Sequence, residues 1–213
     1  IRPINNIVDI TNYVMLEFGQ PLHAFDYEKL DSNEIYVRRA KEDEVLTSLD
    51  GQDRKLSPEN LVITNGQKAV ALAGVMGGEN SQITEETKTI AIESAIFKPV
   101  LTRRTANQLN LRSEASSRYE KGVNYATVQD AADLAAKLMV ELGGGTIVKG
   151  TAKSSHTTSK DVCITTTIDR INGLIGSSLT EKDISSILDR LGFEHEIQNN
   201  SLEVSIPTRR WDI

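Results

Sequence analysis

The chain has 213 residues, of which 38% are hydrophobic and 25% charged, with 14 glycines and 5 prolines, a composition that excludes the disordered and fibrous classes. The formal charge of −6 argues against the broad basic surface of a protein that holds nucleic acid by electrostatics alone. No apolar run approaches the roughly 18 residues of a membrane helix and no signal peptide opens the chain, so we expect a cytoplasmic protein without membrane contact.

The first half of the sequence predicts one helix followed by a sheet. Apolar residues from Ile4 to Phe18 recur at three- and four-residue spacing, the period of an amphipathic helix, and Gly19 and Pro21 end it. After it, short β-rich runs alternate with turn signals such as Asn65-Gly66. The predicted strands are 35–37, 61–64, 69–75 and 89–92.

Helical patterns return in the second half. Helices are predicted over 98–109 and 127–142, and the glycines at 143–145 stop the second one before a short strand over 146–148. The polar stretch that follows has no apolar periodicity, which indicates a linker.

The last part of the chain has a smaller pattern of its own. It predicts a strand over 162–166, a helix over 168–175, a second helix and then a hairpin that turns at Asn199-Asn200. Thr180 and Asp183 have the spacing of a capping box at the start of the second helix. We therefore expect an α/β (α+β) protein, with a mixed-sheet domain and flanking helices over 1–150, a linker over 151–160 and a small α+β domain over 161–213.

Few residue types in the sequence suggest covalent or metal chemistry. The chain has no Gly-x-Ser-x-Gly elbow, no phosphate-binding loop and no His-Glu-x-x-His helix, so neither covalent catalysis nor a metal site is indicated. The single cysteine, Cys163, excludes an internal disulfide, and its β-branched neighbours predict a packing role. His156 lies in the linker, and His195 lies in a strand where we expect exposure to solvent.

Two residues and one glycine-rich segment stand out as candidates for a site. His23 follows Pro21-Leu22 in a loop from which an imidazole can reach a cleft. Glu93 ends an apolar run, either as a carboxylate that points into a polar site or as an exposed edge residue, since a buried carboxylate without a partner is costly. The run over 74–78 is either a tight turn or a place where backbone approaches a ligand closely.

Basic residues cluster at two places within this acidic chain. One group comprises Arg103, Arg104, Arg112 and Arg118, and the other is Arg209-Arg210. Each is either a focal patch for a polyanion or an ordinary solvated surface.

Six segments, in this order and at matching intervals, resemble the beta chain of bacterial phenylalanyl-tRNA synthetase. They are 8–14 (VDITNYV), 19–26 (GQPLHAFD), 74–79 (GVMGGE), 93–95 (ESA), 112–122 (RSEASSRYEKG) and 207–212 (PTRRWD). The chain also begins inside a helical pattern and stops after a turn signal, so we expect it to be part of a longer polypeptide. The resemblance covers nearly the whole chain and is weakest from 150 to 160.

The resemblance implies an editing domain, which removes tyrosine wrongly esterified to phenylalanine tRNA, and a small fifth domain akin to winged or helix-turn-helix modules. Site residues carried over position by position fall into two groups. Near the ester lie His23, Asn12 and Thr11, and around the amino acid side chain lie Glu93, Gly77, Ser113 and Ala115. Some relatives carry Thr at the position of Ser113, a difference that keeps the hydroxyl.

For the whole enzyme the resemblance implies a heterotetramer of two alpha and two beta chains. The synthesis site, with ATP and Mg²⁺, is then in the alpha subunit, and no cofactor is expected in this chain. Two other hypotheses remain open. In the first, the segment is a scaffold and tRNA-binding platform that does not hydrolyse anything. In the second, the last part of the chain binds DNA, but the acidic residues Glu181, Asp183 and Asp189 of the helix after Thr180 argue against it.

Overall fold

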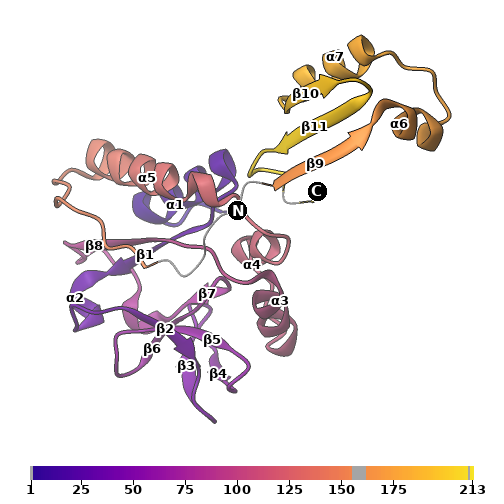
Figure 1. Ribbon diagram of the computed structural model, residues 1–213. Coiled ribbons are helices and arrows are strands. Elements are labelled where there is room, and N and C mark those ends of the chain that lie inside the picture. Colours follow the sequence, from indigo (N-terminus) through magenta and orange to yellow (C-terminus); the bar gives the residue numbers. More distant parts are fainter. Residues whose placement is uncertain (1, 155–161, 211) are drawn as a thin grey trace. The chain divides into compact units, whose positions relative to one another are not determined.

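The computed structural model describes residues 2–154, 162–210 and 212–213 (Figure 1). The chain divides into two compact units, Ile1–Lys149 and Gly150–Ile213. Most of the predicted linker, together with His156 and the first residue of the predicted second domain, lies outside the described residues. In the part of the chain that is described, no helix is long and apolar enough to cross a membrane.

Two helices pack together at one side of the first unit. Helix α1 (Asn6–Phe18) begins where the Asn5 side chain accepts a hydrogen bond from Val8 N at 2.9 Å and ends at Gly19, whose φ of 69° suits a residue without a Cβ. Helix α5 (Val128–Gly143) packs against α1 through an apolar stripe. Their shared core consists of Ile10, Val14, Ala24, Ala131, Ala135 and Met139.

The strands β1 (Leu22–Asp26) and β8 (Ile90–Ser94) form an antiparallel pair whose two faces serve different cores. Because side chains alternate along a strand, Ala24 and its partner Ile92 face α1 and α5. Phe25 and its partner Ala91 face the opposite way, toward the four-stranded sheet. In Figure 1 the helices α1 and α5 lie on one side of this pair and the larger sheet lies on the other.

The four-stranded sheet has the order β2-β5-β6-β7 and is antiparallel throughout. Its strands are β2 (Tyr36–Arg39), β5 (Leu61–Thr64), β6 (Ala69–Leu72) and β7 (Met76–Gly77). Every residue of β6 is buried, as expected for a strand that is covered on both faces. A separate hairpin joins β3 (Val45–Thr47) to β4 (Asp53–Lys55).

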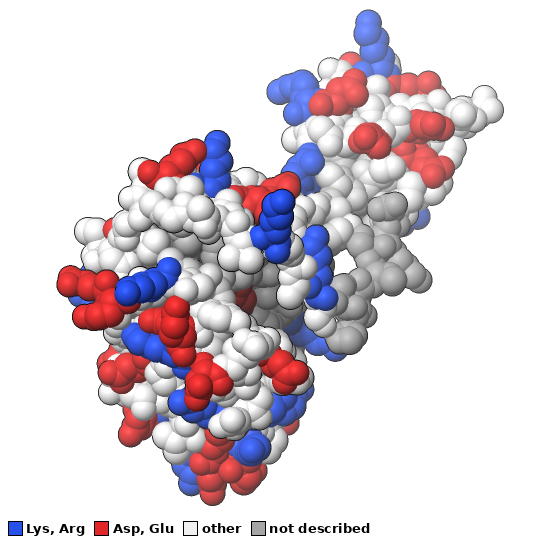
Figure 2. Space-filling model, turned by 90° about the vertical axis from the view of Figure 1, so that its left-hand side faces the viewer, with Lys and Arg blue, Asp and Glu red and all other residues white. Residues whose placement is uncertain are grey.

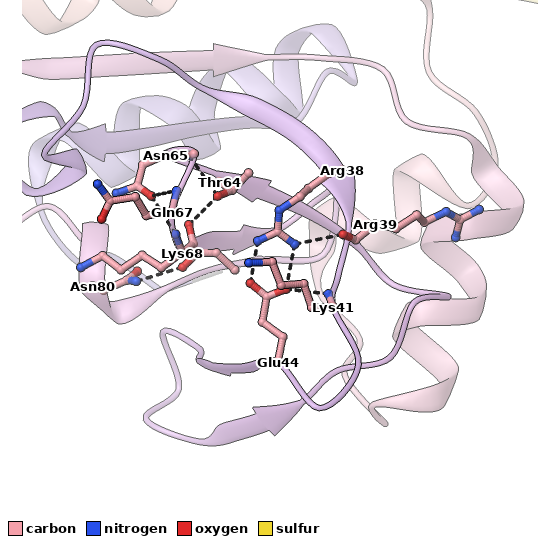
Figure 3. Close-up of polar contacts among 11 residues, drawn as sticks. Arg38, Arg39, Lys41, Glu44, Thr64, Asn65, Gln67, Lys68 and Asn80 are labelled. Atoms are coloured by element: carbon pink, nitrogen blue, oxygen red, sulfur yellow. Dashed lines mark hydrogen bonds and ion pairs between the residues drawn. The ribbon is translucent and has the colours of Figure 1, made fainter.

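Polar side chains hold the loops of this sheet in place (Figure 3). Asn65 Oδ1 accepts hydrogen bonds from the backbone of Gln67 and Lys68 at 3.1 and 2.9 Å and thereby closes the turn between β5 and β6. Arg38 donates two hydrogen bonds to Glu44, at 2.8 and 2.7 Å, and this fork lowers the pKa of Glu44 to about 2. The carboxylate is therefore ionised throughout the physiological range.

Short helices complete the first unit. They are α2 (Tyr27–Leu30), the 3-10 helices η1 (Glu79–Ser81) and η2 (Tyr125–Thr127), α3 (Pro99–Gln108) and α4 (Glu114–Tyr119). Pro99 stands at the first position of α3, where its missing N–H costs no hydrogen bond. Asn60 anchors α3 on the sheet side, since its amide donates to Thr105 at 3.3 Å and Gln108 at 2.9 Å.

The second unit is a three-stranded antiparallel sheet, order β10-β11-β9, with two helices. Its elements are β9 (Val162–Thr167), α6 (Ile168–Ile175), α7 (Glu181–Leu191), β10 (Glu194–Gln198) and β11 (Ser201–Ile206). The predicted capping box between Thr180 and Asp183 is present, and Gly192 ends α7. Asn199 and Asn200 turn the hairpin with positive φ.

The predicted fold class is confirmed, since helices flank the sheets. In place of the predicted mixed sheet there are several sheets, and all their described strand pairs are antiparallel. The strand predicted over 146–148 is wrong, because this segment has no partner strand and Val148 is 81% exposed. The packing role predicted for Cys163 is also wrong, because this side chain is exposed. Its strand neighbours on β11 place it on the outer face, where its thiol lies 3.1 Å from Glu203.

Candidate functional site

His23 and Glu93 are opposite each other in the register of β1 and β8. Both side chains lie on the face that carries Phe25 and Ala91, so they point between the strand pair and the four-stranded sheet rather than toward the helices. The His23 ring meets the edge of Phe25 with centroids 4.5 Å apart. Two titratable side chains thus lie side by side on one face of the strand pair, between two layers.

Gly77 forms the floor beneath the imidazole. A Cβ added to this glycine would lie 2.7 Å from His23 Nε2 and 3.0 Å from Leu49 Cδ1, closer than real carbon atoms approach. Its carbonyl accepts a hydrogen bond from Leu49 N at 3.1 Å, which fixes the backbone at this point. The glycine-rich run therefore permits a close approach, and the group that approaches is the ring of His23.

Burial shifts the pKa values of the two titratable groups in opposite directions. Both residues keep partial access to solvent, yet protein surrounds them densely, and this raises the pKa of Glu93 to about 7 and lowers the pKa of His23 to about 4. Among the described residues no group donates a hydrogen bond to the Glu93 carboxylate, and His23 Nε2 is buried without a partner. Such unpaired groups are uncommon in a folded interior and are frequent where a ligand binds.

Gln20 and Tyr119 close the end of the strand pair beside these residues. Gln20 Nε2 donates to the carbonyls of Pro21 and Ala95 at 3.0 and 2.8 Å. The Tyr119 hydroxyl reaches the same two carbonyls at 3.2 and 3.0 Å. Burial raises the pKa of Tyr119 well above its ordinary value, and the nearby charge of Glu93 adds to this. Neither Gln20 nor Tyr119 was predicted as a site residue, because their burial becomes visible only in the structure.

The other predicted site residues are on α1 and around α4, and most of them make local contacts. Thr11 is buried in α1 and its hydroxyl donates to Val8 O at 2.7 Å, while Asn12 is half-buried one residue later. Ser113 donates to Val75 O at 2.6 Å and accepts from Ser116 N at 3.0 Å, so it caps α4 and ties it to the turn before Gly77. Ala115 packs against the core that contains Phe25.

The structure therefore brings His23, Glu93 and Gly77 together directly, and it brings Ser113 and Ala115 to the same region through α4. It shows no hydrogen bond between Thr11 or Asn12 and either titratable residue among the described side chains. Two surface hollows lie elsewhere, one around Tyr27 and one around Phe193.

The predicted basic cluster is divided between paired and unpaired residues. Arg118 pairs with Glu114 at 2.6 Å and Arg112 with Glu120 at 3.6 Å, whereas Arg104 only approaches Glu59 at 3.8 Å and Arg103 is exposed. On the face shown in Figure 2, basic and acidic side chains are interspersed rather than segregated. On this face, a contact with a polyanion would therefore be local.

The second unit uses its own candidate residues internally. Arg209 donates to the carbonyls of Leu191 and Gly192 at 2.9 and 3.0 Å, so it caps the end of α7. Arg210 pairs with Asp212 at 2.8 Å.

The predicted exposure of His195 is wrong. Its side chain is 9% exposed, because Ser185 Oγ lies 2.8 Å from one ring nitrogen and Phe193 O lies 3.1 Å from the other. Across the described ranges of both units, no group of three or more His, Cys, Asp or Glu side chains is placed to hold a metal ion.

Known proteins match the chain along its whole length. Residues 1–144 match the family described as "B3/4 domain" and residues 164–213 the family described as "tRNA synthetase B5 domain". Phenylalanine–tRNA ligase beta subunits of Streptococcus pyogenes serotype M1 and Geobacillus kaustophilus (strain HTA426) are each 48% identical over all of this chain. The alignments cover 27% and 26% of those relatives, so the chain spans about a quarter of their length.

Among solved structures, an N-terminal fragment of the phenylalanyl-tRNA synthetase beta-subunit from Pyrococcus horikoshii aligns with 97% of this chain and 61% of its own, at 15% identity and a TM-score of 0.43. That similarity is too low to add to the sequence matches.

Proposed function

The chain belongs to the B3/4-domain family of phenylalanine–tRNA ligase beta subunits, and from this premise we propose that its first unit hydrolyses tyrosine wrongly esterified to phenylalanine tRNA. The observation that carries the proposal is the pair His23 and Glu93, which lie opposite each other on one face of the strand pair and have no hydrogen-bond partners among the described residues. A carboxyl group and an imidazole in that arrangement suit recognition of a phenol next to a reacting ester.

The chemistry of the two amino acids explains why a second site is needed. Phenylalanine and tyrosine differ by one hydroxyl, and an apolar pocket rejects an added hydroxyl by only about a hundredfold. An editing pocket must do the converse and reward the hydroxyl. In our proposal Glu93 accepts a hydrogen bond from the tyrosine phenol, whereas phenylalanine would leave this buried group unpaired, which is costly.

Water is the proposed nucleophile. Among the described side chains no serine or cysteine is hydrogen-bonded to His23 or Glu93, so a covalent intermediate is not indicated. His23 is uncharged at neutral pH and its Nε2 has no partner, so it is suited to position water on the ester, whereas its pKa of about 4 makes it a weak base. Asn12 and Thr11 are the proposed assisting residues on α1.

The neighbouring helix α4 provides the proposed wall of the pocket. Ala115 presents a small side chain there and Ser113 holds α4 against the turn that contains Gly77. We further propose phenylalanine tRNA as the substrate, with the exposed arginines of α3 as contacts to its backbone. Residues 98–121 carry six basic and two acidic side chains, although the whole chain has a net charge of −6.

For the complete enzyme we propose a cytoplasmic ligase in which this subunit joins an alpha subunit in a heterotetramer. ATP and Mg²⁺ would act at a synthesis site in the alpha subunit, and the present chain would need no cofactor. These proposals rest on the phenylalanine–tRNA ligase beta subunits to which the chain is similar.

A second candidate function is a non-catalytic scaffold that supports the assembly and holds tRNA. One observation favours it: the hydroxyls of Thr11 and Ser113 are already bonded to backbone carbonyls and so are not free for a ligand. The unpaired state of Glu93 favours hydrolysis, because a pure scaffold gains nothing from a half-buried carboxylate with a raised pKa.

The deciding experiment compares deacylation of tyrosyl-tRNA and phenylalanyl-tRNA by the full two-subunit enzyme with Glu93→Ala. Removing the acceptor should lower the preference for tyrosine by at least about tenfold, the equivalent of one lost hydrogen bond to a charged group. Glu17→Ala, which changes an exposed glutamate on α1, is the matched control. Unchanged selectivity in Glu93→Ala would favour the scaffold.

A further inference from the structure

Two buried side chains, far apart in sequence, hold the same pair of backbone carbonyls. Gln20 is fully buried and Tyr119 is 2% exposed, and each is within hydrogen-bond distance of Pro21 O and Ala95 O. The two side chains also touch each other, with Gln20 Nε2 3.4 Å from the Tyr119 hydroxyl. We call these two side chains and the two carbonyls the carbonyl clamp.

The carbonyl clamp is placed symmetrically with respect to the proposed site. Pro21 precedes the first residue of β1 and Ala95 follows the last residue of β8, so the clamp lies just beyond the final rung of the pair. Going inward, two residues along each strand lead to His23 and Glu93. Any slip or splaying at the clamp would thus move both site residues relative to each other.

We propose that Gln20 and Tyr119 are positioning residues, which hold β1 and β8 together so that His23 and Glu93 keep the separation needed for hydrolysis. This inference rests on the proposed editing function. It goes beyond it because neither side chain needs to touch the substrate.

The clamp acts where the strand pair ends. The side chains of β1 and β8 pack into cores on both faces, but no third strand extends this two-stranded sheet, and the clamp joins the backbone beyond its last rung. Tyr119 reaches the clamp from α4, and its ring packs against Phe97 with centroids 5.2 Å apart. The clamp therefore connects the open end of the strand pair to a rigid part of the core.

The carbonyl clamp has enough hydrogen-bond acceptors for all of its donors. The Gln20 amide and the Tyr119 hydroxyl offer three protons in all, and the two carbonyls accept them with four lone pairs. Contact with two carbonyls also sets the orientation of the Gln20 amide, which leaves its Oε1 buried and unpaired. A fold selected only for stability would not retain that unpaired atom, and a fixed geometry at the site gives a reason to retain it.

The test uses Tyr119→Phe and Gln20→Met in the full two-subunit enzyme. Phenylalanine keeps the ring that packs on Phe97 and removes only the hydroxyl, and methionine keeps the length of Gln20 without its amide. The control is Tyr27→Phe, which removes the hydroxyl that binds Asn33 just after the other end of β1. Steady-state deacylation at several concentrations of tyrosyl-tRNA separates kcat from KM.

We expect each clamp variant to lower kcat by about tenfold to a hundredfold with KM little changed, since small misplacements of catalytic groups cost that much. Water entering the loosened end should also lower the pH at which selectivity for tyrosine appears, because Glu93 would be better hydrated. The control should keep both wild-type values.

Three outcomes would overturn the inference. The first is unchanged kcat in both clamp variants while Glu93→Ala loses selectivity, which removes the clamp but keeps the proposed function. The second is a lower kcat that is fully restored by cooling, without a shift in the pH profile, which indicates a purely structural role. The third is full activity of Glu93→Ala itself, which removes the proposed function and the clamp's role in it.

Discussion

Glu93 lies directly opposite His23 across β1 and β8, and burial favours the uncharged form of both side chains. The pKa of Glu93 is about 7 and that of His23 about 4, so between these values neither group carries a charge. The pair is therefore not an ion pair. It is a neutral site in which Glu93 becomes charged just above neutral pH.

This relationship predicts how stability depends on pH. Because the pKa of Glu93 in the folded chain is raised, its contribution is fully present below the ordinary value of 4.5 and is lost as the pH rises through about 7. The loss by pH 8 is at most about 3 kcal/mol and is reduced by the partial solvent access of the residue. Glu93→Gln, which does not titrate, should gain stability relative to wild type between pH 5 and pH 8.

Urea unfolding of the 213-residue chain at these two pH values measures the difference. Glu17→Gln, at an exposed position, serves as the control and should follow wild type at both. If the free energy of unfolding changed equally between the two pH values in Glu93→Gln and wild type, the Glu93 carboxyl group would be well solvated.

Gly77→Ala should impair the site more than the fold. The new methyl would lie 2.7 Å from His23 Nε2, so the ring must move away from its position opposite Glu93. We expect a clear loss of tyrosyl-tRNA deacylation together with about 1–3 kcal/mol of destabilisation from overpacking.

The matched control for this substitution is Gly173→Ala. Nothing lies within 4 Å of the Cβ that it adds, and alanine should favour helix α6 by up to about 1 kcal/mol. Deacylation by Gly77→Ala at the wild-type rate would show that His23 is not held against this glycine during the reaction.

Arg103→Glu tests the proposed RNA contact. The residue is exposed on α3 and forms no ion pair among the described side chains, so its charge is available to a phosphate. Charge reversal should raise KM for tyrosyl-tRNA severalfold and reduce the dependence of binding on salt by about one phosphate contact. Lys88→Glu, an equal change at another exposed position, should do neither. Equal effects of both variants would indicate general electrostatics instead of a local contact.

Thr180→Ala tests the start of helix α7 in the second unit. The Thr180 hydroxyl accepts from Asp183 N at 3.2 Å and donates to its carboxylate at 2.6 Å, and both bonds would be lost. Thermal or urea unfolding should show a loss of about 1 kcal/mol, as for other N-cap residues. Ser178→Ala, two residues before the cap, should leave stability unchanged, and equal losses in the two variants would argue against the cap.

The longer elements could be predicted from the sequence because their patterns are local. The apolar period identified α1 and α5, and the capping box of Thr180 and Asp183 identified the start of α7. The strands β1, β3, β4 and β7 were missed, and the loop predicted at His23 is wrong, because His23 lies in β1. The strands β3, β4 and β7 have only two or three residues each, too few for an alternating pattern to appear.

The site was predicted only in part, because its geometry depends on distant pairing. Glu93 stood out as a carboxylate after an apolar run, but nothing local indicates that it lies opposite His23, seventy positions earlier. The errors at Cys163 and His195 have a related cause. Which side of a strand faces the core is decided by the neighbouring strand and helix, as Glu203 and Ser185 show.

The two-faced strand pair makes the spacing of the chain as important as its composition. If one residue were deleted from β8 before Ile92, Glu93 would move opposite Ala24 and face α1 and α5, and Ile92 would move opposite Phe25. A change of length in this strand would therefore disturb a hydrophobic core and the proposed site in a single step, even with every side chain chemically intact. Insertions and deletions, more than substitutions, are the changes that this region is least able to accommodate.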